Sequence, residues 1–172
     1  NYSNDNLPLF GISDHIFKTF DDRPNLLTKR EVRVQILADL ELPKNGVIWD
    51  IGAGCGSIGL EALKLRPNLD LFCIDKRIGS KALILENSKR LGVKPKFIFE
   101  EDIIKTLSTR NLSSFEKPNR LVIGGCDKKT KLQIINTMAQ GMRIGDIIVI
   151  PIIDIQTIKE LKEELEDKNF KT

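Results

Sequence analysis

The sequence is poor in the residues that build disulfides, metal sites and aromatic binding surfaces. Its 172 residues include three cysteines, one histidine, one tryptophan and one tyrosine. The cysteines, Cys55, Cys73 and Cys126, are far apart and no C-x-x-C pair occurs. Neither a disulfide framework nor a zinc site is therefore predicted, and we expect no metal. A reducing compartment, the cytoplasm, fits this cysteine usage best.

The net charge is small, and long apolar segments are absent from the sequence. The formal net charge is only +3 although 30% of the residues are charged, whereas a nucleic-acid-binding domain usually has a stronger basic bias. The longest apolar run, IIVIPII at 147–153, is too short to cross a membrane, and no signal peptide is expected. With 41% apolar residues, the chain can form one domain with a substantial core.

Strand-like and helix-like segments alternate along most of the sequence. Strands are predicted at 47–51, 70–75, 96–102, 120–125 and 146–153, and helices at 28–40, 57–66, 79–92, 129–142 and 157–167. A polar connection follows residue 102, and Thr28-x-x-Glu31 predicts a capping box at the start of the first helix. Strands separated by helices of this length indicate an α/β fold with a doubly wound, mostly parallel sheet.

Residues 1–27 show little regular period, apart from one helical turn predicted around HIFKTF at 15–20. We therefore expect an N-terminal arm over 1–27, followed by the main domain over 28–172.

A glycine-rich turn, WDIGAGCGSIG at 49–59, joins the first sheet strand to the next helix. It fits two nucleotide-binding patterns. Residues 54–59 match the dinucleotide fingerprint G-x-G-x-x-G, and residues 50–56 match the D-x-G-x-G-x-G loop of S-adenosylmethionine methyltransferases. In a doubly wound sheet such a turn lies at the carboxyl ends of the strands, where ligands bind. Glycine lets the backbone approach a ligand closely there.

Acidic residues at the strand ends favour the methyl donor. Asp50 would repel the diphosphate of a dinucleotide, but it would attract the methionyl amino group, directly or through water. Asp75 ends the second sheet strand, where a carboxylate can accept from the ribose hydroxyls of either cofactor. Acids at 100–102 end the third, where a carboxylate can read an adenine amino group. The sequence therefore predicts a class I S-adenosylmethionine-dependent methyltransferase fold, which is Rossmann-like. A dinucleotide site and a purely structural turn remain as alternatives.

Four motifs in order resemble the decarboxylating precorrin-6B or cobalt-precorrin-6B C15-methyltransferases of cobalamin biosynthesis. That family typically carries G-I-P-D-x-x-F, then T-K-R-E-x-R, then W-D-x-G-x-G-x-G-S, and later a strand ending in I-G-G. The matching segments here are GISDHIF at 11–17, TKREVR at 28–33, WDIGAGCGS at 49–57 and VIGG at 122–125. The lead-in LPLFG at 7–11 is more similar to the bifunctional members, in which a C5-methyltransferase domain precedes this one.

The chain departs from the family pattern in three places. Ser13 stands where proline is usual, and IGGCDKK at 123–129 replaces the family's I-G-G-S-G-G. Family members also continue into further strands, so we expect the C-terminal strands to be missing from this chain.

The resemblance implies methylation of the C15 meso carbon of precorrin-6B or cobalt-precorrin-6B, with S-adenosyl-L-methionine as cofactor and loss of the ring C acetate carboxyl as carbon dioxide. Together with the strand-end argument it predicts cofactor contacts from Thr28, Asp50, Gly52, Ala53, Gly54, Cys55, Gly56, Asp75, Asp102 and Ile103. Substrate contacts are expected from Asp14, Lys29, Arg30, Arg33, Gly124 and Gly125.

Basic side chains are expected around the pocket because a precorrin carries many carboxylates, and Lys128 and Lys129 are further candidates. For Thr28 a purely structural capping role is an equal alternative to a cofactor contact. No catalytic residue is identified. A homo-oligomer is expected, with a fused C5-methyltransferase domain as a further option.

Three alternative functions share parts of this pattern. A methyltransferase acting on RNA, or on another small molecule, would have the same fold and cofactor. The small net charge, the few Trp and Tyr residues and the lack of a D/N-P-P-Y/F segment after the fourth sheet strand oppose a nucleic-acid substrate. The third alternative is a non-catalytic module that binds the cofactor and supports assembly.

Overall fold

A five-stranded parallel sheet forms the centre of the computed structural model, which describes residues 7–109, 116–168 and 170–172. The strands are β1 (Gly46–Ile51), β2 (Leu69–Asp75), β3 (Phe97–Glu100), β4 (Arg120–Ile123) and β5 (Ile147–Val149). Their order is β3-β2-β1-β4-β5, and every neighbouring pair is parallel. The chain moves outward from β1 to β3 and then returns to the other side of β1. This confirms the predicted doubly wound sheet and places its switch point between β1 and β4.

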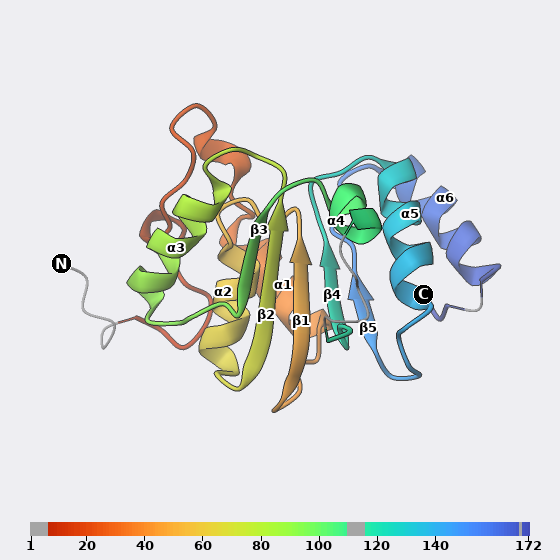
Figure 1. Cartoon of the computed structure of the whole chain (residues 1–172), viewed down its shortest axis with the longest axis horizontal. Helices are drawn as coiled ribbons and strands as arrows, with labels where there is room; N and C mark the ends of the chain where they lie inside the picture. Colours follow the sequence, from red (N-terminus) through yellow and green to blue (C-terminus); the bar gives the residue numbers. More distant parts are fainter. Residues whose placement is uncertain (1–6, 110–115, 169) are drawn as a thin grey trace.

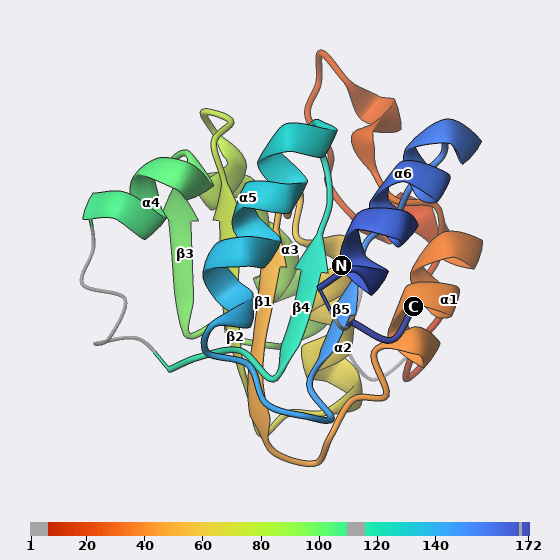
Figure 2. The same cartoon turned by 90° about the vertical axis from the view of Figure 1, so that its right-hand side faces the viewer.

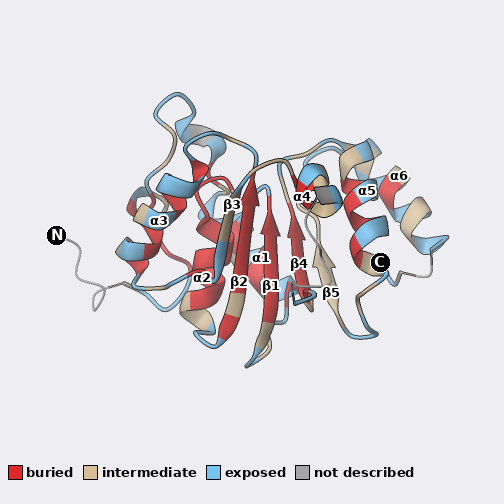
Figure 3. Cartoon of the chain, in the orientation of Figure 1, coloured by how far each residue is buried: buried red, intermediate tan, exposed pale blue. Residues whose placement is uncertain are grey.

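Helices cover both faces of the sheet (Figure 1). They are α1 (Arg30–Asp39), α2 (Ser57–Leu65), α3 (Ser80–Leu91), α4 (Ile103–Thr109), α5 (Lys128–Ala139) and α6 (Ile155–Glu166). Residues of α1, α2 and α3 share one core cluster with Ile48 of β1, whereas α4 and α5 share the other with Trp49. The two strand residues are neighbours, so the alternation of side chains along β1 supplies both cores. β1, β2 and β4 are the most buried strands (Figure 3).

One helix was missing from the sequence-based prediction. α4 occupies part of the segment that is expected to be a polar connection, and the rest of that connection includes 110–115, which lie outside the described residues. Asp102 caps this helix, because its Oδ1 accepts from the Ile104 N–H at 2.9 Å. Ile103 and Leu107 contribute to the second core cluster. The sequence did contain a signal for α4, namely a capping residue followed by apolar residues at helical spacing, but the helix has only seven residues.

The described part of the arm, from residue 7 onward, is packed onto the domain. Two short 3₁₀ helices, Asp14–Ile16 and Pro24–Leu26, replace the single turn expected near residue 15. Ile12 and Phe17 are 0% and 5% exposed and lie in the same core cluster as α2 and α3. The arm thus forms part of the fold beside the carboxyl ends of the strands (Figure 1).

The C-terminal helix α6 lies beside α5 (Figure 2). Lys128 of α5 and Glu160 of α6 form an ion pair with an Nζ–Oε2 distance of 2.7 Å, and Leu161 of α6 is 2% exposed. In the residues that the structure describes, no helix combines the length and apolar character needed to span a bilayer.

Candidate functional site

The glycine turn after β1 has a backbone that only glycine adopts readily. Gly52, Gly54 and Gly56 all have positive φ, at 75°, 58° and 79°. A Cβ on Gly52 would lie 2.4 Å from the carbonyl oxygen of Gly124, so close approach of the turn to the end of β4 also requires glycine. A Cβ on Gly54 would meet nothing within 4 Å. The middle of the turn therefore faces open space, where a ligand can approach the backbone.

Asp75, at the end of β2, anchors this turn. Its Oδ2 accepts from the Gly54 N–H at 2.7 Å, and its Oδ1 accepts from the Arg77 N–H at 2.8 Å. The N–H groups of Gly52 and Ala53 donate to the carbonyl of Ile74, at 2.8 and 3.2 Å. Asp75 is only 7% exposed, and each of its oxygens keeps a further lone pair with which to accept from a ligand hydroxyl.

Asp50, at the end of β1, lies beneath the turn. Its carboxyl is 2% exposed, and its Oδ2 accepts from the Gly59 N–H of α2 at 3.0 Å. Burial raises the pKa of Asp50 to about 7; the Gly59 hydrogen bond opposes this rise, and the charge of Asp75 adds to it. A cation placed near this carboxyl would hold it in its ionised form.

The ends of β3 and β4 lie at the same edge of the sheet as the glycine turn. Together with Asp50, Asp75 and the turn at 52–56, Asp102 and residues 124–126 form what we call the strand-end rim. Asp102 caps α4, and its charge reaches the thiol of Cys126, which directly follows the Gly124–Gly125 end of β4. Gly125 has a φ of 61°. Ile103 is 7% exposed, and its side chain packs into the second core cluster. Burial raises the pKa of Cys126 and of Cys55, so neither residue is marked as a reactive thiolate.

Arg33, which is predicted to contact the substrate, is instead fully buried in an ion-pair network with its guanidinium turned inward. Arg33 is 0% exposed and pairs with Glu61 of α2 at 3.1 Å and with Asp14 of the arm at 2.6 Å. Glu61 also accepts from the N–H groups of Gly11 and Ile12. Asp14, a second predicted substrate residue, is therefore held to α1 by this pair. The network fixes the arm against the helix that follows the glycine turn.

The predicted capping box at Thr28 is also absent. α1 begins at Arg30, its N-cap residue is Lys29, and no side chain caps it. The Thr28 carbonyl accepts from Nη1 of Arg33 at 2.5 Å. Arg30 donates from Nε to the Gly11 carbonyl at 2.6 Å, and Lys29 is exposed. The capping explanation of Thr28 is therefore wrong, because no side chain caps this helix. Thr28 contributes its carbonyl to a hydrogen bond with Arg33 instead.

Asn87 is a positioning residue that the sequence did not reveal. It lies on α3 and is 0% exposed. Its Nδ2 donates to the carbonyls of Cys55 and Lys18 at 3.0 and 2.9 Å, and its Oδ1 accepts from the Lys18 N–H at 2.8 Å. One amide thus joins the glycine turn to the arm. An isolated Asn in an amphipathic helix carries no sequence signal of such a role.

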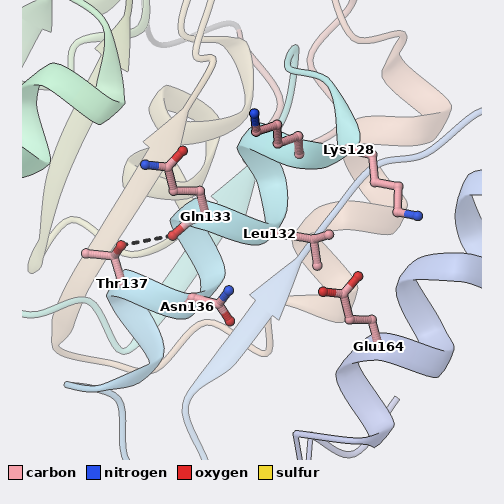
Figure 4. Close-up of a pocket in the computed structure, with 7 residues that line it drawn as sticks. Lys128, Leu132, Gln133, Asn136, Thr137 and Glu164 are labelled. Carbon is pink, nitrogen blue, oxygen red and sulfur yellow. Dashed lines mark hydrogen bonds between the residues drawn. The ribbon is translucent and has the colours of Figure 1, made fainter.

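A groove of about 710 Å³ lies elsewhere, between α5 and α6 (Figure 4). Apart from one leucine, it is lined by side chains that carry polar or charged groups, with much of the exposed surface coming from their carbon atoms: Lys128, Lys129, Leu132, Gln133, Asn136, Thr137 and Glu164. Lys128 and Lys129, which are expected to face the substrate, both line this groove, and Lys128 pairs with Glu160 of α6. The glycine turn, Asp50 and Asp75, which are predicted to bind the cofactor, come together instead at the strand-end rim.

The described residues fit an S-adenosylmethionine molecule at this rim. The open space before Gly54 lets the backbone approach a ligand, the Asp75 carboxylate lies at the strand end beside it, and Asp50 lies below. Asp102 lies at the neighbouring strand end, within electrostatic reach of Cys126. Carboxylates at successive strand ends suit a ligand with an amino group and ribose hydroxyls better than a diphosphate.

Comparison with known proteins decides the family. Residues 18–168 match the model of a family described as the precorrin methyltransferase domain. The chain belongs to the precorrin methyltransferase family. A probable cobalt-precorrin-6B C(15)-methyltransferase (decarboxylating) from Saccharolobus solfataricus is 32% identical over 162 residues, which cover 93% of this chain and 78% of that protein.

Two solved structures support the assignment to the precorrin methyltransferases. Precorrin-6y C5,15-methyltransferase from Geobacter metallireducens is 29% identical with a TM-score of 0.80, over 96% of this chain and 83% of that one. The precorrin 8W decarboxylase of Methanobacterium thermoautotrophicum is 26% identical with a TM-score of 0.76, over 93% of this chain and 82% of that one. Both confirm the class I methyltransferase fold predicted from the glycine turn and the strand pattern.

Proposed function

We propose that this methyltransferase transfers a methyl group from S-adenosyl-L-methionine to the C15 meso carbon of precorrin-6B or cobalt-precorrin-6B, with loss of the ring C acetate carboxyl. The observation that carries the proposal is the likeness to a C15-methyltransferase along 93% of the chain. The strand-end rim adds the geometry of a methyl-donor site, in which Gly54 faces open space and Asp75 anchors the turn.

Different residues of the strand-end rim bind different parts of the cofactor. In this proposal Asp75 accepts from the ribose hydroxyls, and Asp50 attracts the methionyl ammonium group. The glycine turn lets the methyl donor approach the backbone closely, and the adenine lies on the side of Asp102. Asn87 and the Arg33–Glu61 pair hold the turn and the arm, so these groups keep their positions when the ligand is absent.

Alignment is the main catalytic contribution that we assign to the protein. The bound methyl sulfonium supplies a strong electrophile, and the meso carbon of a reduced tetrapyrrole is an enamine-like nucleophile. Good orientation of two reactants can remove about 7–11 kcal/mol of barrier. The conjugated macrocycle can accept the electron pair that decarboxylation releases. No acid–base residue of this chain is therefore assigned to the chemical step.

A fused C5-methyltransferase domain and a homo-oligomer belong to the same proposal. The name of the solved relative from Geobacter metallireducens covers both the C5 and the C15 reactions. Chain mass in solution, measured by light scattering on the purified protein, tests the oligomer.

The function is tested by incubating the protein with [¹³C-methyl]-S-adenosylmethionine and cobalt-precorrin-6B. We expect the ¹³C label on C15 of the tetrapyrrole, together with release of one carbon dioxide per methyl group transferred. Label at another carbon, or methylation without carbon dioxide release, would contradict the proposal.

Binding titrations separate the cofactor from the substrate. Calorimetry should show binding of S-adenosylhomocysteine but not of NAD⁺, and Asp75→Ala should weaken it about tenfold or more, since two hydrogen bonds to a charged group are lost. Asp70→Ala is the matched control, because Asp70 lies on the same strand and pairs with exposed Lys96. Binding of NAD⁺ alone would refute the methyl-donor site.

A further inference from the structure

One lysine near the start of α5 differs from the neighbouring lysines in the direction of its side chain. Lys128 and Lys129 face the groove between α5 and α6. Lys131, on the same helix, is 8% exposed, and its Nζ donates to the carbonyl of Cys126. Its side chain therefore turns back toward the strand-end rim rather than outward. The loop after β4 is also where the chain departs from the family's I-G-G-S-G-G pattern.

The ammonium of Lys131 has no carboxylate partner among the described residues. Its acidic neighbour one turn back, Asp127, caps the helix instead, because its two oxygens accept from the N–H and hydroxyl of Thr130 at 2.8 and 3.1 Å. The only hydrogen-bond acceptor that Lys131 has among the described residues is the neutral carbonyl of Cys126, although the charge of Asp127 also acts on it. An ammonium forms its strongest hydrogen bonds with anions, so this lysine is suited to an anionic ligand.

Lys131 lies beside the glycine turn. The carbonyl it contacts belongs to the residue directly after Gly124–Gly125, and Gly124 touches the glycine turn at Gly52. A second cation, Lys76, follows Asp75 at the end of β2, and its charge also reaches Cys126. The charges of both lysines, one on α5 and one just after β2, reach Cys126, as do the negative charges of Asp102 and Asp127.

We propose that Lys131 binds a carboxylate side chain of the tetrapyrrole substrate, with Lys76 adding long-range attraction. This inference rests on the proposed function, since it assumes a polycarboxylate ligand at this rim. The carboxylate that it binds is one that the product retains. An ammonium held against the departing carboxylate would stabilise its charge and oppose loss of carbon dioxide.

The test compares Lys131→Met with Lys89→Met, a control at an exposed lysine near the C-terminal end of α3. In steady-state kinetics with cobalt-precorrin-6B, we expect Lys131→Met to raise KM about 10- to 100-fold, since a hydrogen bond to a charged group is lost. Affinity for S-adenosylhomocysteine should stay within about twofold. The melting temperature of the free protein is followed as well, because the variant leaves the Cys126 carbonyl without its hydrogen-bond donor. The control variant should match the wild type in all three.

A second readout does not depend on turnover. Uroporphyrin, a tetrapyrrole with many carboxylates, is titrated by fluorescence onto protein saturated with S-adenosylhomocysteine. Weaker binding by Lys131→Met, at least partly restored in Lys131→Arg, supports the carboxylate site even if the wild type fails to methylate cobalt-precorrin-6B.

Three results would overturn the carboxylate site. Normal turnover with an unchanged KM in Lys131→Met would leave the proposed function intact and refute the role of the lysine. A lowered melting temperature with unchanged uroporphyrin binding would show that Lys131 only holds the Cys126 loop. Failure of the wild type to bind either tetrapyrrole would refute the carboxylate site and the proposed substrate together.

Discussion

Replacing Asp50 with asparagine should stabilise the free protein and weaken its cofactor binding. The amide keeps the shape of the carboxyl and an oxygen that accepts from the Gly59 N–H, but it removes the charge. Burial raises the pKa of Asp50 from 3.8 to about 7 in the folded protein. The folded protein therefore holds this proton more tightly than the unfolded chain does.

The sign follows from proton binding. Between pH 4 and 7 the folded state carries this proton and the unfolded state has lost it, so this carboxyl lowers the free energy of unfolding as pH rises. A shift of about three units corresponds to about 4 kcal/mol in all, at about 1.4 kcal/mol per unit. About 3 kcal/mol of this falls between pH 5 and 8. The variant lacks this loss, so its stability advantage over the wild type grows across that range.

The measurement is urea unfolding at several pH values, followed by the fluorescence of Trp49, the only tryptophan, which is 2% exposed. Only the difference between variant and wild type is used, so that other titrating groups cancel. S-adenosylhomocysteine should bind the wild type more weakly as pH falls from 8 to 6, because protonated Asp50 no longer attracts the ligand's ammonium. In Asp50→Asn that binding should be weaker throughout and nearly independent of pH. A stability difference that stays constant from pH 5 to 8 would refute a raised pKa at Asp50.

Three further variants probe the site. Gly54→Ala should cost about 1–2 kcal/mol of stability for its left-handed backbone, yet reduce S-adenosylhomocysteine affinity at least tenfold in calorimetry because its methyl group enters open space; unchanged affinity would place the ligand elsewhere. Arg33→Met should cost about 3–5 kcal/mol in chemical unfolding by stranding a buried carboxylate. Adding Glu61→Gln, which keeps an acceptor for the Gly11 and Ile12 N–H groups but removes the charge, should recover much of it; no recovery would mean that packing, not charge, dominates. Asn87→Leu should cost about 1–3 kcal/mol and speed amide hydrogen exchange near Cys55; protection equal to the wild type would contradict its role in holding the turn.

Much of the fold and the main part of the site could be predicted from sequence because they depend on local patterns. Runs such as 47–51 and 70–75 are apolar and short, and the segments between them have helical spacing, so the parallel sheet followed directly. The glycines at 52, 54 and 56 require positive φ, which makes the turn visible in the sequence. Asp50 and Asp75 could be placed because strand ends of a parallel sheet meet at one edge.

The direction of individual charged side chains could not be predicted in this way. Arg33 and Lys131 both look like solvent-facing basic residues on amphipathic helices. The tertiary structure buries the first between Glu61 and Asp14, and turns the second toward the carbonyl of Cys126. The partners of Arg33 come from segments 19 and 28 residues away, and helical spacing carries no information about such distant neighbours.

The sequence by itself determined the order of the strands and of the helices other than α4, the glycine turn and the family, because each depends on short-range spacing or on motif order. Only the tertiary structure decided that the irregular arm is clamped to α1 and α2, that Asn87 joins the arm to the glycine turn, and that Asp50 is buried enough to shift its pKa. These properties arise when segments far apart in the chain exclude water from the same charged groups. The energy of a buried charge depends on those surroundings and not on the residues next to it in sequence.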